Sequence, residues 1–337
     1  MAPRPTSGTP EWLGQVAEPI VDPAREIIDP HHHLWPAGGA LPYGVDELVA
    51  DTTSGHRVVG TVFMECGAGY RTDAPDHLRC VGETEFVAAA ADDLAARHPA
   101  AAPIMAIVGS ADLTDPRLDD ILDAHESAAA GRFRGIRDAL ARSLDPEAHT
   151  IPAFNVEGKH DDPAFRAGVR RLGERGLTYD SWHFHWQLAD FAALADAAPD
   201  TTMVLDHLGT PCGVGRFAGR ADEVFDAWRV DIAEVAMRPN AVVKLGGLAM
   251  PDNGFGWHEA DAPPTSAEVL DAQRRWYEHS IECFGPERCM FESNFPVDKF
   301  SLGYHVYWNA MQHLAAPFSD DEQAAMFAGT ARRVYSL

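Results

Sequence analysis

The chain has 337 residues, and its 27 Lys and Arg stand against 51 Asp and Glu, which gives a formal net charge of -24. An acidic chain of this kind repels phosphate backbones and anionic lipid surfaces, which excludes nucleic acid and membranes as expected partners. Its five cysteines are odd in number and lack C-x-x-C spacing, which argues against a disulfide framework and a structural zinc site. We therefore expect a reducing, cytoplasmic compartment, with no membrane span and no secretory signal.

Residues 1–24 are rich in Pro, Gly and Thr, which predicts an arm that lies over the surface or reaches a neighbouring subunit. Residues 25–337 are predicted to form one domain, in which short apolar runs alternate with longer helical segments. The expected strands are 27–30, 58–65, 104–109, 133–137, 177–182, 202–206, 241–245 and 289–292. The expected helices are 83–98, 116–130, 163–174, 188–198, 221–237 and 267–284, with a closing helix over 319–336. Eight such steps predict a distorted (β/α)8 TIM barrel with its active site at the carboxyl ends of the strands.

The first predicted strand ends in three consecutive histidines, after the apolar pair Ile27 and Ile28. Because alternate side chains of an extended segment share a face, His31 and His33 project together while His32 points elsewhere. Two imidazoles on one face can bind a divalent metal or hold a carbonyl group and a water. A histidine-rich loop or a tag remnant is the alternative, but a tag would be terminal and would lack the isoleucine pair.

The other predicted strands also end in ionisable or amide side chains. They are Glu65 at the second, Arg134 and Arg137 on the fourth, His183 and His185 after the fifth, His207 after the sixth, Lys244 on the seventh, and Asn294 and Asp298 after the eighth. Any one of them could be a structural polar group. Their shared position in the repeat favours a single active site, because the carboxyl ends of barrel strands converge.

Five short motifs together resemble the amidohydrolase-2 (amidohydrolase-related) family. They are Asp29-x-His31-x-His33-Leu34-Trp35, Phe133-Arg134-Gly135-Ile136-Arg137, Leu205-Asp206-His207-Leu208-Gly209, Lys244-Leu245-Gly246-Gly247-Leu248 and Phe291-Glu292-Ser293-Asn294-Phe295-Pro296. The resemblance implies a hydrolase or decarboxylase of the amidohydrolase superfamily, a group that includes lactonases and aromatic-acid decarboxylases. It also implies that His31, His33 and His207 meet in the site, where a zinc or manganese ion would bind them in the relatives that use a metal.

One position departs from the family pattern, because Asn294 stands where an aspartate is usual. An amide cannot take a proton from water at neutral pH and is a poor zinc ligand. Asp298 is our first choice for the base, followed by Glu65 or a histidine, and then by chemistry that needs no strong base. The same departure leaves open whether a metal is bound at all, since a histidine pair alone can polarise a carbonyl.

Several residues are expected to contact the substrate. Arg137 is placed to hold a carboxylate in two parallel hydrogen bonds, and Lys244 either binds substrate or pairs with a carboxylate of the barrel. We expect His185 rather than His183 to point inward, with packing between Trp182 and Trp186 as its alternative. Trp35 and other loop aromatics suggest a flat aromatic or cyclic ligand, and residues 250–264 could form a lid; these aromatics are Tyr70, Phe184, Trp186 and Trp257.

The sequence thus predicts a hydrolase that opens a small lactone or related cyclic ester. Strand-end histidines would polarise the carbonyl, and a carboxylate would activate water. Decarboxylation of an aromatic acid with a bound metal is the second hypothesis, and a catalytically degenerate barrel that binds a ligand is the third. The expected partner is a small anionic or aromatic molecule, and a homodimer is a reasonable expectation from the arm.

Overall fold

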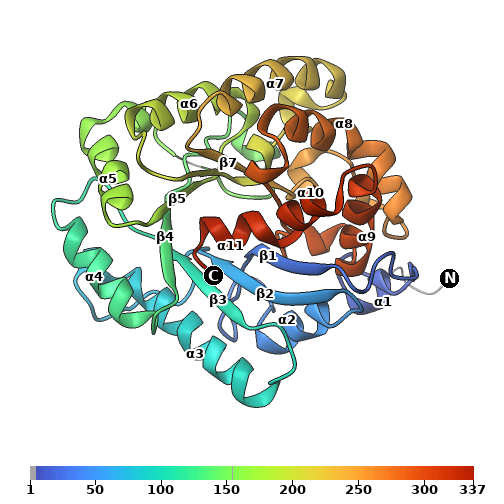
Figure 1. Ribbon diagram of the computed structural model, residues 1–337, viewed down its shortest axis with the longest axis horizontal. Coiled ribbons are helices and arrows are strands. Elements are labelled where there is room, and N and C mark those ends of the chain that lie inside the picture. Colours follow the sequence, from blue (N-terminus) through green and yellow to red (C-terminus); the bar gives the residue numbers. More distant parts are fainter. Residues whose placement is uncertain (1–4, 154) are drawn as a thin grey trace.

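A computed structural model describes residues 5–153 and 155–337, so residues 1–4 of the predicted arm lie outside the described residues (Figure 1). Eight parallel strands follow one another in sequence order around a barrel. They are β1 (Glu26–His32), β2 (Arg57–Met64), β3 (Ile104–Gly109), β4 (Phe133–Arg137), β5 (Thr178–Ser181), β6 (Met203–Leu205), β7 (Ala241–Leu245) and β8 (Cys289–Phe291). The predicted TIM barrel is confirmed.

The barrel closes just beyond the paired residues of β1 and β8. The Asn294 N–H donates to the His31 carbonyl at 3.1 Å, and the His33 N–H donates to the Phe295 carbonyl at 2.8 Å. The register of β1 on β2 shifts twice, once between Asp29 and His32. The first strand is therefore irregular at the point where its histidines begin.

The helices cover the outside of the ring of strands. They are α1 (Pro10–Leu13), α2 (Val45–Thr52), α3 (Val81–Arg97), α4 (Leu118–Ala128), α5 (Pro163–Glu174), α6 (Leu188–Ala197), α7 (Ala221–Ala236), α8 (Ser266–Phe284) and α9 (Tyr304–Ala315), followed by α10 (Asp320–Ala324) and α11 (Thr330–Val334). Helices α1, α2 and α9 were not predicted from the sequence. The predicted closing helix is divided by a π-helical turn, Ala325–Gly329, which lies between α10 and α11.

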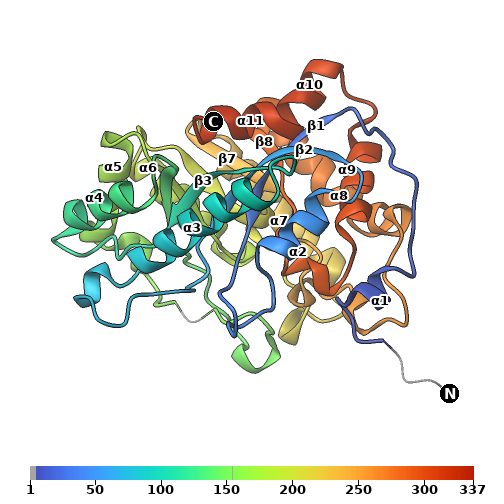
Figure 2. The ribbon, with the colours of Figure 1, turned by 90° about the horizontal axis from the view of Figure 1, so that it is seen from below.

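The last two helices close one end of the barrel. Figure 1 shows α11 lying across the middle of the ring of strands, and Figure 2 shows α10 and α11 at the end opposite the long loops. Alternate residues of the strands form a small apolar core inside the barrel, which Ala331, Val334 and Tyr335 join from the closing helix. Its strand members are Ile28, Val62, Met64, Ala106, Val108, Val204, Val242 and Met290. The amino-terminal end of the barrel is thus filled, and only the opposite end is left for a site.

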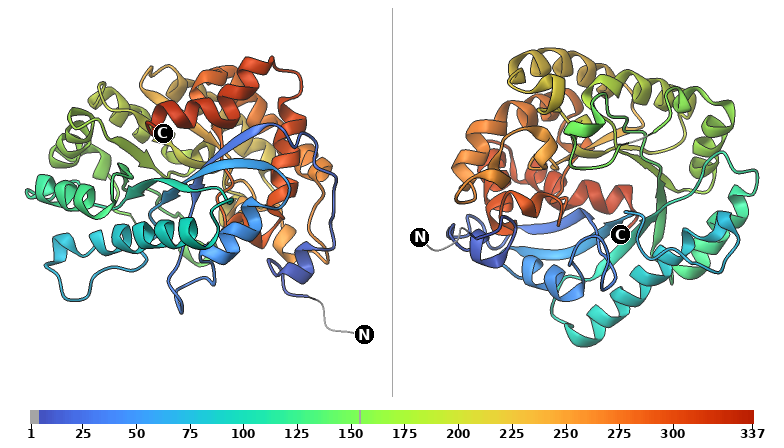
Figure 3. Two further views of the ribbon diagram at one scale, coloured as in Figure 1. Left: turned by 60° about the horizontal axis from the view of Figure 1, so that its bottom comes forward. Right: turned by 180° about the vertical axis from the view of Figure 1, so that it is seen from behind.

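The N-terminal arm packs against its own chain. It runs along the outside of the barrel from β1 to α1 (Figure 3). There the fully buried Trp12 donates its Nε1–H to the carbonyl of Ala260 at 3.3 Å, and Gln15 donates to the carbonyl of Asp261 at 3.2 Å. The arm therefore fixes one end of the predicted lid segment. None of the described helices has the length and apolarity needed to cross a bilayer.

Candidate active site

Charged side chains form the next layer inside the barrel, above the apolar core. Val204, Val242 and Met290 face the interior, so the residues two positions further on face it too. These residues are Asp206, Lys244 and Glu292, and Arg137 of β4 and Asp180 of β5 join them. Asp180, Asp206, Lys244 and Glu292 have no exposed surface, and Arg137 is 7% exposed.

Lys244 lies between two carboxylates. Its Nζ is 3.0 Å from Asp180 Oδ2 and 3.0 Å from Asp206 Oδ1. Burial lowers the pKa of this ammonium group, but Asp206 and Asp180 outweigh burial and raise it. Of the two roles that the sequence left open for Lys244, the structure shows pairing with barrel carboxylates. Tyr335 joins the group by donating its hydroxyl to Asp180 Oδ2 at 2.5 Å, which links the closing helix to the site.

Arg137 extends this network toward the mouth of the barrel. Its Nε is 3.1 Å from Asp206 Oδ2 and 3.7 Å from Glu65 Oε1, and its Nη1 donates to the Glu65 carbonyl at 3.2 Å. Burial opposes the charge of Asp206, but Lys244, His31 and Arg137 hold its pKa well below the usual range. Asp206 is therefore an anion shared by two cations.

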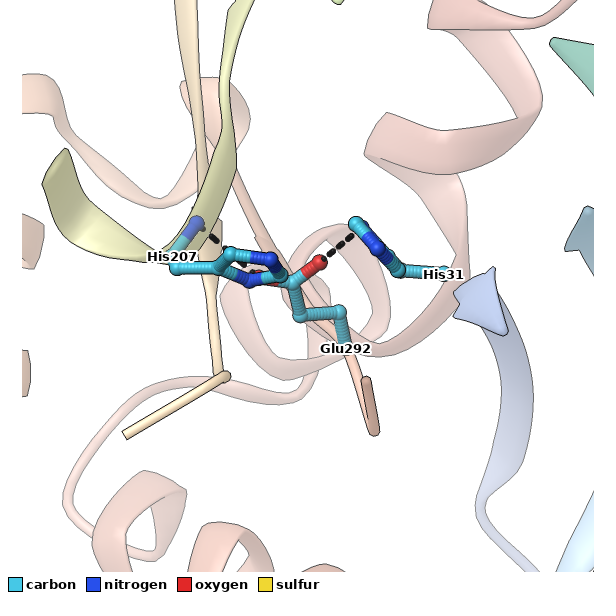
Figure 4. Close-up of side chains that lie close together, drawn as sticks. All are labelled: His31, His207 and Glu292. Carbon is cyan, nitrogen blue, oxygen red and sulfur yellow. Dashed lines mark hydrogen bonds and ion pairs between the residues drawn. The ribbon is translucent and has the colours of Figure 1, made fainter. Parts of the chain in front are cut away.

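Glu292 joins two of the predicted histidines, as Figure 4 shows. Its Oε2 is 2.8 Å from His31 Nδ1, and its Oε1 is 2.7 Å from His207 Nδ1 and 3.1 Å from the His207 backbone nitrogen. Burial raises the pKa of Glu292, but His207 and His31 outweigh it and hold that pKa far below its usual range. An ionised carboxylate only accepts hydrogen bonds, so His207 carries a proton on Nδ1 and leaves Nε2 free of one when neutral. The tautomer of His31 is not fixed in this way, because the Lys244 ammonium group, which only donates, lies 3.3 Å from the same Nδ1.

The third histidine is held in the same tautomer by the backbone. His33 Nδ1 is 2.9 Å from the Met64 carbonyl, which can only accept, so the Nε2 of His33 also carries a lone pair. This atom faces His31 Nε2 at 3.3 Å. Burial, with His31 and Arg137 adding to it, holds the pKa of His33 well below its usual value. The His33 lone pair is therefore met either by a proton on His31 Nε2 or by a metal ion that both nitrogens bind.

The same cluster has an excess of negative charge. Three fully buried carboxylates, those of Asp180, Asp206 and Glu292, meet one ammonium and one guanidinium group. Buried charge is costly unless it is paired, and burial lowers the pKa of both His207 and His33, so a cation held by the imidazoles would supply the missing positive charge. His31, His207 and Glu292 offer ligand atoms that all lie within 4.8 Å of one another. Imidazoles backed by a carboxylate fit a zinc or manganese ion, and a proton would meet the same need.

Asn294 and Asp298 form a pair beside the histidines. The Asn294 backbone bonds to His31, as described above, and its Nδ2 donates to Asp298 Oδ1 at 2.9 Å. Asp298 Oδ2 accepts from the Ala249 N–H at 3.1 Å, and the side chain is fully buried. Burial raises the pKa of Asp298 well above its usual value. The role of Asp298 as the base stays a prediction.

The two fifth-strand histidines make their contacts elsewhere. His183 packs against Phe191 of α6, with ring centroids 5.4 Å apart, and its ring nitrogens have no hydrogen-bond partner in the described chain. His185 accepts the Cys212 N–H on Nδ1 at 3.2 Å and packs against Trp186 and Phe217. Asp180, three residues before His183, is the β5 side chain that reaches the cluster. Trp35 lies beside the site, with its ring centroid 5.7 Å from that of His33.

Three members of the cluster were not predicted as site residues: Asp180, Asp206 and Glu292. Each lies two residues beyond an inward-facing position of its strand, so strand alternation carried the signal. Asp206 and Glu292 even lie within the motifs that carry the family resemblance. For the fifth, sixth and eighth strands, the candidates named from the sequence were His183, His185, His207, Asn294 and Asp298, each of which follows the acid of the same strand in the chain.

Comparison with known proteins agrees with this geometry. The family model described as "Amidohydrolase" matches residues 28–337. The uncharacterized protein y4mH of Sinorhizobium fredii is 30% identical over 332 residues, which cover 92% of this chain and 98% of that protein. An L-fucono-1,5-lactonase of Burkholderia multivorans is 30% identical over 237 residues, which cover 70% of this chain and 73% of the lactonase.

Solved structures show the same barrel. An amidohydrolase of Burkholderia multivorans, solved with bound zinc, is 26% identical with a TM-score of 0.69, over 92% of this chain and 99% of the other.

Replacing Lys244 tests the charged layer. Lys244→Met should lower the free energy of unfolding by about 3–5 kcal/mol, because it leaves Asp180 and Asp206 buried without their ammonium partner. Urea titration followed by circular dichroism measures this change. The control is Arg229→Met, since Arg229 pairs with the exposed Asp226 and its loss should cost about 1 kcal/mol or less. Equal costs at the two positions would contradict the account of Lys244.

The position of His183 predicts a pH dependence of stability. Burial lowers its pKa from 6.5 to about 3, so the unfolded chain binds a proton there that the folded chain does not. Stability from this group is present above about pH 6.5 and is lost as pH falls toward 3, at about 1.4 kcal/mol per pH unit. His183→Leu should remove that slope between about pH 4.5 and 5.5, measured by urea titrations, whereas replacing the exposed His313 should not. If the free energy of unfolding depends on pH equally steeply in His183→Leu and in the wild type, His183 is charged in the folded protein in this pH range.

Proposed function

The chain belongs to the amidohydrolase family, a family of hydrolases, and we propose that it hydrolyses a small lactone. The observation that carries the proposal is the pair of Nε2 atoms of His31 and His33, 3.3 Å apart, with Glu292 and the Met64 carbonyl behind them. Lone pairs held in this way concentrate a positive charge, as a proton or a metal ion, where a carbonyl oxygen can accept it. The Burkholderia multivorans lactonase, similar over most of its length, supports the choice of a cyclic ester.

The histidines would act on the carbonyl and the carboxylates on water. His31, His33 and His207 orient the lactone carbonyl and stabilise the negative charge that develops on its oxygen when water adds. A zinc or manganese ion held by these residues would supply Lewis-acid polarisation of that carbonyl. The ring C–O bond then breaks, and the leaving oxygen takes a proton to give the hydroxy acid.

Arg137 is the proposed anchor for an acid group on the substrate. Its Nε and Nη1 make the contacts to Asp206 and Glu65, which leaves Nη2 for a ligand within the described site. Because Nε and Nη1 are engaged, a carboxylate would meet only the N–H groups of Nη2, in a charge-assisted contact and not in the two parallel hydrogen bonds expected from the sequence. Lactones that bear a carboxylate should therefore be better substrates than neutral sugar-acid lactones of the same ring size.

Two carboxylates compete for the role of base. Both oxygens of Asp298 accept hydrogen bonds and its side chain has no access to solvent. The Glu65 side chain is 16% exposed, and burial raises its pKa although Arg137 opposes the shift. A base near the mouth with a raised pKa suits proton abstraction from water at neutral pH. The contacts thus favour Glu65 over Asp298, which the sequence ranked first.

Metal content and hydrolysis of a lactone panel test the histidine pair together. We expect protein purified without chelator or tag to bind about one zinc or manganese ion, and His33→Asn to lose it along with at least about 10²-fold of the hydrolysis rate. His98→Asn is the control, because His98 pairs with Asp46 on the surface. If the metal-free protein hydrolyses lactones, the positive charge between His31 and His33 is a proton and not a metal ion. Metal binding with no turnover on any lactone or aromatic acid would contradict the proposal and favour a degenerate barrel.

Amide substitutions separate the two candidate bases. Glu65→Gln should lower kcat by about 10²–10⁴-fold and remove the acidic limb of the pH–rate profile, because the amide cannot take a proton. Asp298→Asn keeps an acceptor for Ala249 and should change kcat by less than about tenfold. The reverse order of the two effects would return the role to Asp298.

A further inference from the structure

A second group of chemically active side chains lies in the loops beyond β4, β6 and β7. His149 follows the 3-10 turn Pro146–Ala148, Cys212 follows the segment of His207, and Asp252 is in the turn Pro251–Asn253. Asp252 is 1% exposed and Cys212 is 2% exposed, and the His149 side chain is 3% exposed. None of the three contacts His31, His33 or His207 in the described chain, and the proposed hydrolysis does not use them.

The three side chains are arranged as a nucleophile, a base and an orienting acid. Cys212 Sγ is 4.0 Å from His149 Nε2, the long end of the range for sulfur, and His149 Nδ1 is 3.3 Å from Asp252 Oδ2. The Asp252 carboxylate also accepts the N–H groups of Thr150 at 2.7 Å and Ile151 at 3.1 Å. The acid is therefore fixed to the backbone that carries the histidine, and the ring presents Nε2 to the sulfur.

The charge on His149 suits a thiolate partner. Burial lowers the pKa of His149, but hydrogen bonds with Asp252 and Cys212 outweigh burial and raise it to about 9. Asp145, four residues earlier, is the other acid whose charge interacts with this ring. The sulfur contacts both His149 Nε2 and, at 3.8 Å, the Val214 carbonyl, so the imidazolium is placed to give its proton to a group that leaves when the sulfur reacts.

The other Cys–His contacts of the described chain are different. Cys80 Sγ is 3.7 Å from His125 Nε2, and Cys283 Sγ is 3.5 Å from His279 Nε2. In both cases that Nε2 also lies 3.0 Å or less from a backbone carbonyl, Ser110 for His125 and Arg229 for His279. A nitrogen that donates to a carbonyl already holds its proton and cannot take one from sulfur. Burial also raises the pKa of four thiols, those of Cys66, Cys80, Cys283 and Cys289.

A cavity of about 240 Å³ lies next to Cys212. Cys212, Phe217, Asn253 and Trp276 are among the residues that line it. Asn253 is 8% exposed and donates its Nδ2–H to the Pro211 carbonyl, but its Oδ1 has no hydrogen-bond partner among the described residues. An unpaired buried acceptor in the wall of a cavity is available to a hydrogen-bond donor there, either water or a small ligand.

We propose that Cys212, His149 and Asp252 form a reactive-thiol site at which a small hydroperoxide oxidises Cys212 to a sulfenic acid. The Cys212 thiolate attacks one peroxide oxygen, an S–O bond forms and the O–O bond breaks. Sulfur loses two electrons and the peroxide gains them. The departing hydroxide of hydrogen peroxide, or the alkoxide of an organic hydroperoxide, takes the proton of the His149 imidazolium and leaves as water or alcohol, so the other products are sulfenic acid and neutral imidazole. A hydroperoxide is small enough for the cavity, and its O–H group can donate a hydrogen bond to Asn253 Oδ1.

The test is to treat the full-length protein with hydrogen peroxide near neutral pH in the presence of dimedone, which traps sulfenic acids. Mass spectrometry of the peptides gives a rate for each of the five cysteines. Cys212 should be trapped at least about tenfold faster than the other four, although Cys66 and Cys283 are more exposed. A rate at Cys212 no higher than at Cys66 and Cys283 would overturn the proposal.

Two variants show whether the triad causes this reactivity. His149→Gln and Asp252→Asn should each lower the Cys212 rate by about tenfold and leave the Cys66 and Cys283 rates unchanged, with near-ultraviolet circular dichroism as the check on folding. Cys212→Ser should remove the signal and so assign it. Rates at Cys212 that are unchanged in both folded variants would contradict a role for the histidine and the acid. If either variant fails to fold, the comparison among cysteines in the wild-type protein still decides.

Discussion

The ion pairs of Lys244 inside the barrel are the interaction on which the rest of the site depends. One ammonium group meets Asp180 and Asp206, each at 3.0 Å, in a place without exposed surface. Because removal of one partner leaves an uncompensated buried charge, the group holds together as a unit. Asp180 links it to Tyr335 of the closing helix, and Asp206 links it to Arg137. The closed end of the barrel and its open mouth are thus connected through the same few atoms.

The excess of carboxylates explains why the histidines can do chemistry. Glu292 holds His207 by Nδ1 and lies beside His31 Nδ1, and the Met64 carbonyl holds His33 by Nδ1, so the Nε2 atoms of His207 and His33 are left as lone pairs. The buried negative charge then favours a proton or a divalent cation at these atoms. Asn294 fits this account, because the carboxylate that contacts His31 and His207 comes from Glu292, two residues earlier. The unusual amide therefore pairs with Asp298 without removing the charge that the site needs.

Much of this site could be predicted from the sequence, and the part that was missed has a specific cause. Period-two alternation identified His31 and His33 as a pair, and the repeat of strand ends identified Arg137, Lys244 and His207. The same alternation, extended one step along β6 and β8, points to Asp206 and Glu292. Helix α9 was missed because its buried face includes the polar Asn309 and Gln312, which do not match the apolar stripe that a sequence search expects.

The sequence by itself determined the barrel, the family and the shared face of His31 and His33, because these follow from local periodicity and short motifs. Only the tertiary structure decided that His183 packs against Phe191 and that His185 meets Cys212, since loop conformation sets the direction of a side chain beyond the end of a strand. It also decided that Glu292 lies between His31 and His207, and that His149, Cys212 and Asp252 meet. These groups come from distant parts of the chain, and only closure of the barrel brings them within hydrogen-bond distance.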